Sequence, residues 1–319
     1  MKNLYRSFIG IDIGKYEFVS HLKNETKAKT YSNNCKGFQK FFKAHKESLA
    51  HSLVVLETTG GYERGCLDFL LAKGIAVHRA DTRKIKNFVR SLGQRAKTDS
   101  LDAQALSLYG CERQERLVLY KKADKKQEEL KLLVERRQDL KQMLVQEKNR
   151  FQAPLNKGLR SGIKTVMVCL EKQISNVEES ISKIINEDKS LSRKKEVLKT
   201  IPGVGEITAV LLLGFLPELG QLNRKEVASL CGVAPYARQS GEKNYCGRTY
   251  GGRRNMRPIL YMAAMGARRK KGSELASFFE RLTKNGKKPI VALVAVMRKI
   301  VVIANARIKE EFYAPDSIC

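Results

Sequence analysis

The chain has 319 residues, with 61 Lys and Arg against 33 Asp and Glu, so its net charge is +28. A hydrophobic content of 42% is that of a globular protein, and the length predicts two or three domains with cores of their own. The large positive charge favours a polyanionic partner, and nucleic acid before an anionic membrane.

The cysteines and histidines argue against two kinds of site. The seven Cys residues form no CxxC pair and the four His residues have no metal-ligand spacing, which disfavours both a zinc site and a disulfide framework. An odd number of scattered Cys residues fits a reducing cytosol. The first residues lack an apolar signal core, and no segment approaches roughly eighteen uninterrupted apolar residues, the length of a membrane span. We therefore expect a soluble, cytoplasmic protein with no membrane partner.

Residues 1–110 alternate strand and helix patterns. The stretch SFIGIDIGK, Ser7 to Lys15, predicts a buried strand, and residues 16–22 predict the return arm of a hairpin. SLVVLE, Ser52 to Glu57, predicts a second buried strand. Helices are predicted over 37–47 and 63–72 and a further strand over 75–79, so the fold class expected here is α/β, around a largely parallel sheet with a hairpin at its start.

Four carboxylates occur where this fold would bring side chains together. Asp12 stands in the first strand, where a carboxylate either needs a compensating cation or bonds a turn at the strand end. Glu57 ends its strand at the edge where α/β sheets form sites. KTDSLDA predicts a helix from near Thr98 with Asp99 and Asp102 on one face, although acids there also suit the helix dipole.

Oxygen ligands without His or Cys suit Mg²⁺ or Mn²⁺. Two such ions roughly 3.5–4 Å apart can activate a nucleophile and stabilise the leaving oxygen of a phosphodiester. An acidic pocket within a strongly basic chain therefore indicates a nuclease or a polynucleotidyl transferase.

Residues 120–200 show the spacing of paired helices. Apolar residues recur at steps of four and three through the second part of this region, which predicts a coiled coil. The first part follows a looser seam that includes Arg137 and Glu147. Two helices folding back as a hairpin, or pairing with another chain, both fit, and we favour dimerisation. The regular seam consists of Ile163, Met167, Leu170, Ile174, Val177, Ile181 and Ile184.

The C-terminal part holds two candidate nucleic-acid elements. In TIPGVG, Gly203 and Gly205 form a turn before an apolar helix, similar to the helix-hairpin-helix element that offers backbone N–H groups to phosphate; an ordinary helical corner is the alternative. Residues 231–272 then predict a Gly-rich, basic loop with interleaved Tyr residues, leading into a helix over 258–268. Its basic residues are Arg238, Lys243, Arg248, Arg253, Arg254 and Arg257.

Ser240 lies among these arginines, before Gly241. Neighbouring arginines could stabilise the charge of a phosphoryl transition state, but no His stands nearby to act as a base. Composition alone therefore favours a phosphate-contacting or turn serine over a nucleophile.

Five segments taken in order resemble one family. IDIGK, LETTG, KTDSLDA, IPGVG and GVAPYARQSG together are similar to the DEDD transposases of bacterial insertion sequences, the insertion-sequence one-ten family, which includes site-specific DNA invertases. The resemblance covers nearly the whole chain. It implies an RNase H-like domain similar to the Holliday-junction resolvase RuvC over 1–118, a coiled-coil dimerisation region over 119–196 and a mostly α transposase domain over 197–319.

The resemblance also implies the site and the partners. It makes Asp12, Glu57, Asp99 and Asp102 the metal-binding tetrad, and it places a catalytic serine at Ser240, reversing the expectation from composition. It implies donor and target DNA, a structured non-coding bridge RNA that guides recombination, and dimers that assemble into tetramers near the nucleoid. The expected function is RNA-guided, Mg²⁺-dependent excision and insertion of an insertion sequence. A RuvC-like junction-resolving endonuclease that uses water and a non-catalytic nucleic-acid-binding scaffold are the alternatives.

Overall fold

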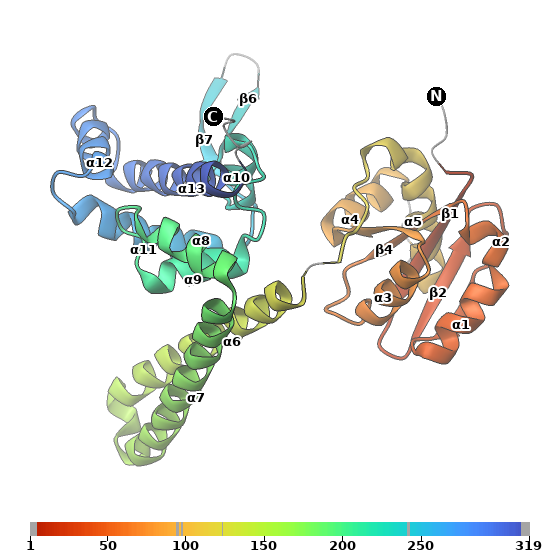
Figure 1. The fold of residues 1–319 in the computed structure, drawn as a ribbon, viewed down its shortest axis with the longest axis horizontal. Helices are drawn as coiled ribbons and strands as arrows, with labels where there is room; N and C mark the ends of the chain where they lie inside the picture. Colours follow the sequence, from red (N-terminus) through yellow and green to blue (C-terminus); the bar gives the residue numbers. More distant parts are fainter. Residues whose placement is uncertain (1–4, 94–95, 97, 123, 241–242, 314–319) are drawn as a thin grey trace. The chain divides into compact units, whose positions relative to one another are not determined.

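The computed structural model describes residues 5–93, 96, 98–122, 124–240 and 243–313, without the side chains of 155 and 237–246. The chain divides into two compact units, Met1–Lys122 and Ala123–Cys319 (Figure 1). Each unit is described by itself.

The N-terminal unit is a mixed sheet with helices on both faces. Its five strands lie in the order β3-β2-β1-β4-β5, with β1, β2 and β3 antiparallel and β4 and β5 parallel to β1. This confirms the α/β unit that begins with a hairpin. The elements are β1 (Ser7–Ile13), β2 (Glu17–Leu22), β3 (Lys29–Ser32), α1 (Cys35–Ala44), α2 (Lys46–Leu49), β4 (Ser52–Glu57), α3 (Arg64–Ala72), β5 (Ala76–Ala80), α4 (Thr82–Ser91), α5 (Asp99–Arg113) and η1 (Gln114–Arg116).

Alternation along β1 and β4 divides this unit into two cores. Ile9 and Ile11 pack with Phe38 and Phe41 of α1 and with the apolar side of α3. Phe8 packs on the other face, with Leu53, Val55 and the inner residues of α4 and α5. The even-numbered residues of β1 and the odd-numbered residues of β4 therefore face α5.

The described part of the C-terminal unit is helical except for one hairpin, which confirms a mostly α C-terminal part. The strands β6 and β7 pair antiparallel where a Gly-rich loop was predicted, so that prediction was wrong. The elements are α6 (Lys125–Gln152), η2 (Pro154–Leu159), α7 (Arg160–Glu187), α8 (Lys189–Lys199), α9 (Glu206–Phe215), α10 (Arg224–Leu230), β6 (Pro235–Ser240), β7 (Lys243–Thr249), α11 (Met256–Arg269), α12 (Glu274–Lys284) and α13 (Pro289–Tyr313).

The long helices α6 and α7 pack against each other within the chain (Figure 1). Ile174 of the predicted seam is buried against Leu140 and Leu144 of α6, with Met167, Leu170 and Val177 beside them. Of the two arrangements that the seam allowed, the structure shows the hairpin. Dimerisation stays a prediction.

Helix α13 is long and apolar enough to cross a membrane by length and composition. Its buried side chains, such as Val296, Ile300 and Ala304, belong to the core shared with α9, α10 and α11. This packing is that of a central core helix.

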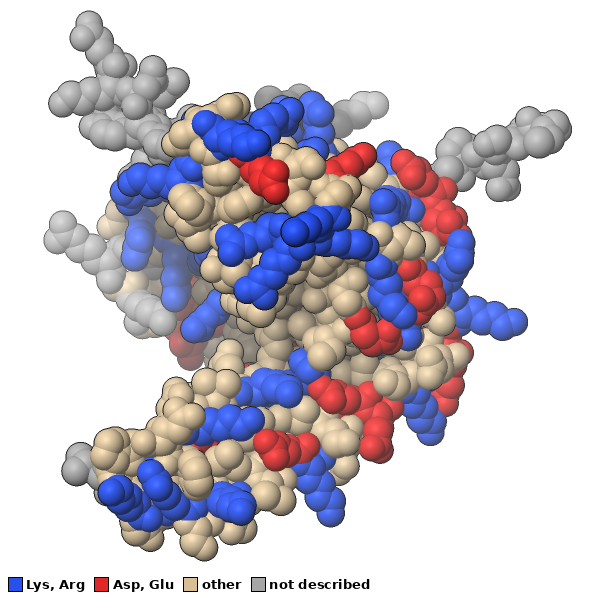
Figure 2. Space-filling view, turned by 90° about the vertical axis from the view of Figure 1, so that its left-hand side faces the viewer, with Lys and Arg blue, Asp and Glu red and all other residues tan. Residues whose placement is uncertain are grey.

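Over the face shown in Figure 2, Lys and Arg side chains stand in groups, with fewer Asp and Glu between them.

Candidate metal and nucleic-acid sites

Asp12 and Glu57 lie side by side at the carboxyl edge of the sheet. β1 and β4 are parallel in one constant register that places Ile11 beside Leu56, so the next residues, Asp12 and Glu57, are neighbours. Asp12 is one of the even-numbered residues of β1 and Glu57 one of the odd-numbered residues of β4, so both lie on the face of the sheet that α5 covers. Both are half-buried. The fold thus brings these two carboxylates to one position.

Helix α5 adds the other two carboxylates. It packs on β1 so closely that a Cβ on Gly10 would lie 2.0 Å from the Ala103 carbonyl oxygen, while Gly110, further along α5, lies over Val55 and Phe8. The helix therefore runs opposite to β1, and its first turn points toward the end of β1 that carries Asp12. Asp99 and Asp102 stand in that turn, which Thr98 caps by accepting a hydrogen bond from the Leu101 N–H at 3.3 Å.

The donor set fits a hard divalent cation. All four predicted ligands are carboxylates from three elements that meet at one edge, which is the chemistry that Mg²⁺ and Mn²⁺ select. In the part of the chain that the structure describes, no three His, Cys, Asp or Glu side chains are close enough to share a metal ion. The four carboxylates stand on elements that meet at one edge of the sheet, but among the described residues no three of them form a metal-binding cluster.

Glu63, which no sequence pattern singled out, organises the loop that follows Glu57. Its buried carboxylate accepts hydrogen bonds from the Thr59 and Gly61 backbone N–H groups, at 3.2 and 2.9 Å, and from the Thr59 hydroxyl. Arg79 of β5 donates to its other oxygen at 2.5 Å. Burial alone would raise the pKa of Glu63, but the backbone donors and Arg79 lower it to about 2.

Ser240 is the last residue of β6, where its backbone pairs with Lys243 of β7. The side chains of Ser240, Arg238 and Lys243 lie outside the described part of the structure, as do Gly241 and Glu242. At the base of the hairpin, the rings of Tyr236 and Tyr250 pack with their centroids 4.6 Å apart, and the Tyr236 hydroxyl hydrogen-bonds Ser229 at 2.6 Å.

The remaining basic residues of this segment differ in their surroundings. Arg248 and Arg254 are exposed and Arg257 is half-buried. Arg253 is held by the Glu218 carboxylate at 2.5 and 2.8 Å and by the Phe215 carbonyl oxygen, which gives its guanidinium a role in the fold.

The turn of TIPGVG is shaped by packing. Gly203 has a φ of +85°, and a Cβ there would lie 2.2 Å from the Ala263 carbonyl oxygen of α11. Gly205 is exposed at the start of α9, but the next residue, Glu206, forms ion pairs with Lys195 and Lys199 at 2.8 and 3.0 Å. A carboxylate in the first turn opposes phosphate binding, so the structure favours the alternative of a helical corner.

Comparisons with known proteins identify the relatives of this chain. A family model of the DEDD IS110 type, described as "Transposase", matches residues 9–158, and a model described as "Transposase IS116/IS110/IS902 family" matches residues 195–280. Two proteins called "Pilin gene-inverting protein", from Moraxella bovis and Moraxella lacunata, are each 27% identical over 315 residues, covering 96% of both chains.

Proposed function

The chain belongs to the IS110-type DEDD transposase family and is a DNA recombinase, and from that premise we propose that it excises and inserts an insertion sequence by Mg²⁺-dependent strand exchange. The observation that carries the proposal is the meeting of β1, β4 and the first turn of α5 at one edge of the sheet. The mixed sheet with its antiparallel start also supports an RNase H-like, RuvC-like domain.

In this proposal the tetrad holds the metal ion. Asp12 and Glu57 come from neighbouring strands and Asp99 and Asp102 from α5, so the helix sets the distance between the two pairs. A bound Mg²⁺ or Mn²⁺ would supply Lewis acidity and would stabilise charge on phosphate oxygens. Glu63 fixes the loop behind Glu57 and acts as a positioning residue.

We assign the nucleophile to Ser240. Its Oγ would bond to the phosphorus of a DNA phosphodiester while the bond to one sugar oxygen breaks, leaving a phosphoserine ester and a free sugar hydroxyl. Attack by a hydroxyl of the new partner strand would reverse the step and release the serine. Of the nearby cations, Arg248, Arg254 and Arg257 are the described ones that would hold the strand.

The partners in this proposal are donor DNA, target DNA and a guide RNA. A net charge of +28 supports more than one nucleic-acid partner, and it supports a cytoplasmic, nucleoid-associated protein. Outer positions of the α6–α7 hairpin support self-association into dimers and tetramers. Exposed apolar side chains there are Leu132, Met143, Val145, Val166 and Val168.

A recombination assay on a plasmid carrying donor and target sites tests the metal site. We expect Asp12→Ala and Glu57→Ala each to abolish recombination while nucleic-acid binding is retained. The exposed Glu47→Ala on α2 is the matched control and should recombine normally. Recombination by either tetrad variant would contradict the proposed metal site.

Denaturing gels test the serine. We expect a covalent protein–DNA adduct from the wild-type protein and none from Ser240→Ala. Thr249→Ala, which removes a hydroxyl at the other end of the hairpin, is the control and should give a normal adduct. Cleavage without any adduct would point to hydrolysis by water, and an adduct at normal yield in Ser240→Ala would refute the assignment.

A further inference from the structure

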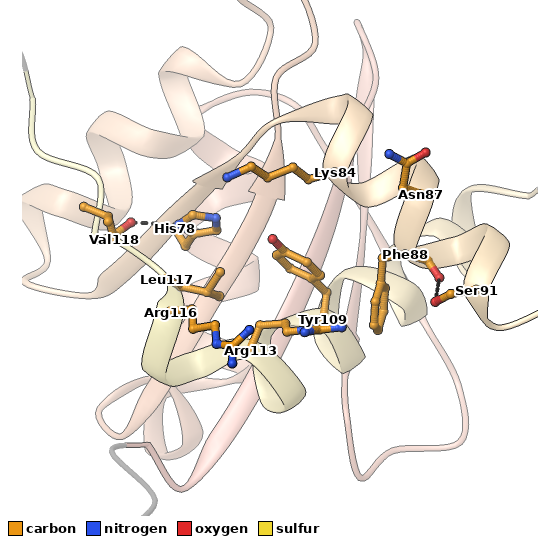
Figure 3. A pocket seen from close by; sticks show the side chains of 10 residues that line it. All are labelled: His78, Lys84, Asn87, Phe88, Ser91, Tyr109, Arg113, Arg116, Leu117 and Val118. Carbon is orange, nitrogen blue, oxygen red and sulfur yellow. Dashed lines mark hydrogen bonds between the residues drawn. The ribbon is translucent and has the colours of Figure 1, made fainter. Parts of the chain in front are cut away.

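A cavity of about 600 Å³ opens in the N-terminal unit between β5, α4, α5 and η1 (Figure 3). It belongs to none of the sites described above. It lies beside the last turn of α5, whereas the tetrad residues stand in the first turn. From the helical rise, Asp102 and Arg113 are separated by roughly 16 Å along the helix.

Among the described residues of its lining, every charged side chain is a cation. Lys84 reaches it from α4, Arg113 from α5 and Arg116 from η1 (Figure 3). All three are exposed, and within the described part of the chain none of them has an ion-pair partner. Three cations without an ion-pair partner around one hollow favour an anion as the ligand, and Arg guanidinium groups match phosphate oxygens in pairs.

Flat rings line the same cavity. The Tyr109 ring lies between His78 and Phe88, with centroids 6.4 and 5.2 Å away. The Tyr109 hydroxyl points into the hollow (Figure 3) and has no hydrogen-bond partner among the described residues, although the residue is only 8% exposed. His78 is fixed by a 2.7 Å hydrogen bond between Nδ1 and the Val118 carbonyl oxygen.

We propose that this cavity binds one unstacked nucleotide of a single-stranded nucleic acid. The phosphate would lie against Arg113, Arg116 and Lys84, the base against the aromatic wall, and the Tyr109 hydroxyl would hydrogen-bond the base edge. A volume of about 600 Å³ lies within the ~300–1,000 Å³ of small-ligand pockets. The inference rests on the proposed function only in taking nucleic acid as the partner.

Binding of full-length protein to labelled single-stranded DNA and RNA of one sequence, without Mg²⁺, tests the proposal apart from cleavage. The probe variant is Arg113→Ala with Arg116→Ala. Its control is Lys86→Ala with Arg90→Ala, two exposed cations on α4 outside the lining. We expect the probe variant to bind on the order of tenfold more weakly than the control. The slope of log affinity against log salt concentration should be smaller in magnitude by about 1.4, because two phosphate contacts are lost.

Photocrosslinking with 5-iodouracil in the same oligonucleotides locates the base. We expect crosslinks on the peptide that carries Tyr109, lost in the arginine variant, and weaker binding without loss of folding in Tyr109→Phe. The strand bound more tightly, DNA or RNA, identifies the source of the nucleotide. The proposal would be overturned if both double variants lost the same affinity for single strands. It would also be overturned if the probe variant lost as much affinity for duplex DNA as for single strands.

Discussion

Glu63 links a single buried carboxylate to the stability of the N-terminal unit. Its pKa is lowered to about 2 from an ordinary 4.5, so the ionised form stabilises the fold above pH 4.5 and that contribution is lost as the pH falls toward 2. We expect Glu63→Gln to lower the free energy of unfolding by about 3 kcal/mol at pH 7. The deficit relative to wild type should shrink below pH 4.5.

Urea unfolding of both proteins between pH 7 and pH 3 measures this difference. Glu112→Gln, an exposed carboxylate on α5, is the control and should cost less than about 0.5 kcal/mol. A deficit that does not change with pH would show that Glu63 acts by packing alone.

Gly10 sets how closely α5 approaches β1. Its added Cβ would lie 2.0 Å from one backbone atom of α5 and 2.4 Å from another, so Gly10→Ala forces the helix away from the strand. We expect a loss of about 1–3 kcal/mol in thermal unfolding and reduced recombination, because Asp99 and Asp102 move with α5. Gly162→Ala, which meets nothing within 4 Å, should leave both unchanged or raise stability.

At this scale the sequence reveals residue types better than their contacts. Asp12, Glu57, Asp99 and Asp102 can be picked out because carboxylates at strand and helix ends are conspicuous. Glu63 escaped notice because its donors are backbone groups of its own loop, and Arg79 reaches it from another strand. Likewise, nothing in the segment near Arg253 shows that Glu218 neutralises it.

At the scale of elements, the α6–α7 hairpin carries an ion pair with unequal burial. Arg137 of α6 is 8% exposed and binds Glu178 of α7, 43% exposed, at 2.6 Å. Glu178→Met would leave a buried guanidinium without its partner, which we expect to lower the free energy of unfolding by about 3 kcal/mol. Arg137→Met leaves a carboxylate that water can reach, so it should lower the free energy of unfolding by only about 1 kcal/mol.

Thermal or urea unfolding of the wild-type protein, the two single variants and the double variant completes a double-mutant cycle for this ion pair. We expect the double replacement to be nearly neutral. The exposed pair of Lys148 and Glu171 across the same helices should contribute less than about 1 kcal/mol. Equal costs for the two single variants would contradict the role of burial.

Periodicity identified most elements but not their partners. A heptad seam looks the same whether it packs on its own chain or on another, so the sequence could not choose between the hairpin and dimerisation. β6 and β7 were predicted as a loop because glycines, basic residues and interleaved tyrosines are typical of a segment that holds a nucleic-acid backbone. PYARQS, the sequence of β6, has no regular apolar–polar alternation, and its pairing is irregular between Tyr236 and Arg238, so periodicity gave no sign of a strand.

At the scale of the whole molecule, the proposed reaction gives the acidic and basic parts of the chain separate tasks. The four carboxylates stand on elements that meet at one edge of the N-terminal sheet, while Ser240 and its arginines belong to the C-terminal unit. The proposed reaction needs both units on one DNA strand. The family relationship, rather than composition, is what associates Ser240 with the tetrad.

Binding of Mn²⁺, followed by electron paramagnetic resonance, tests the tetrad most directly because it needs no DNA. We expect the wild-type protein and Glu47→Gln to take up Mn²⁺, with Mg²⁺ displacing it, and Asp12→Asn and Glu57→Gln to lose most of that uptake. Mn²⁺ uptake by Asp12→Asn and Glu57→Gln equal to that of wild type would contradict a metal site at this edge of the sheet.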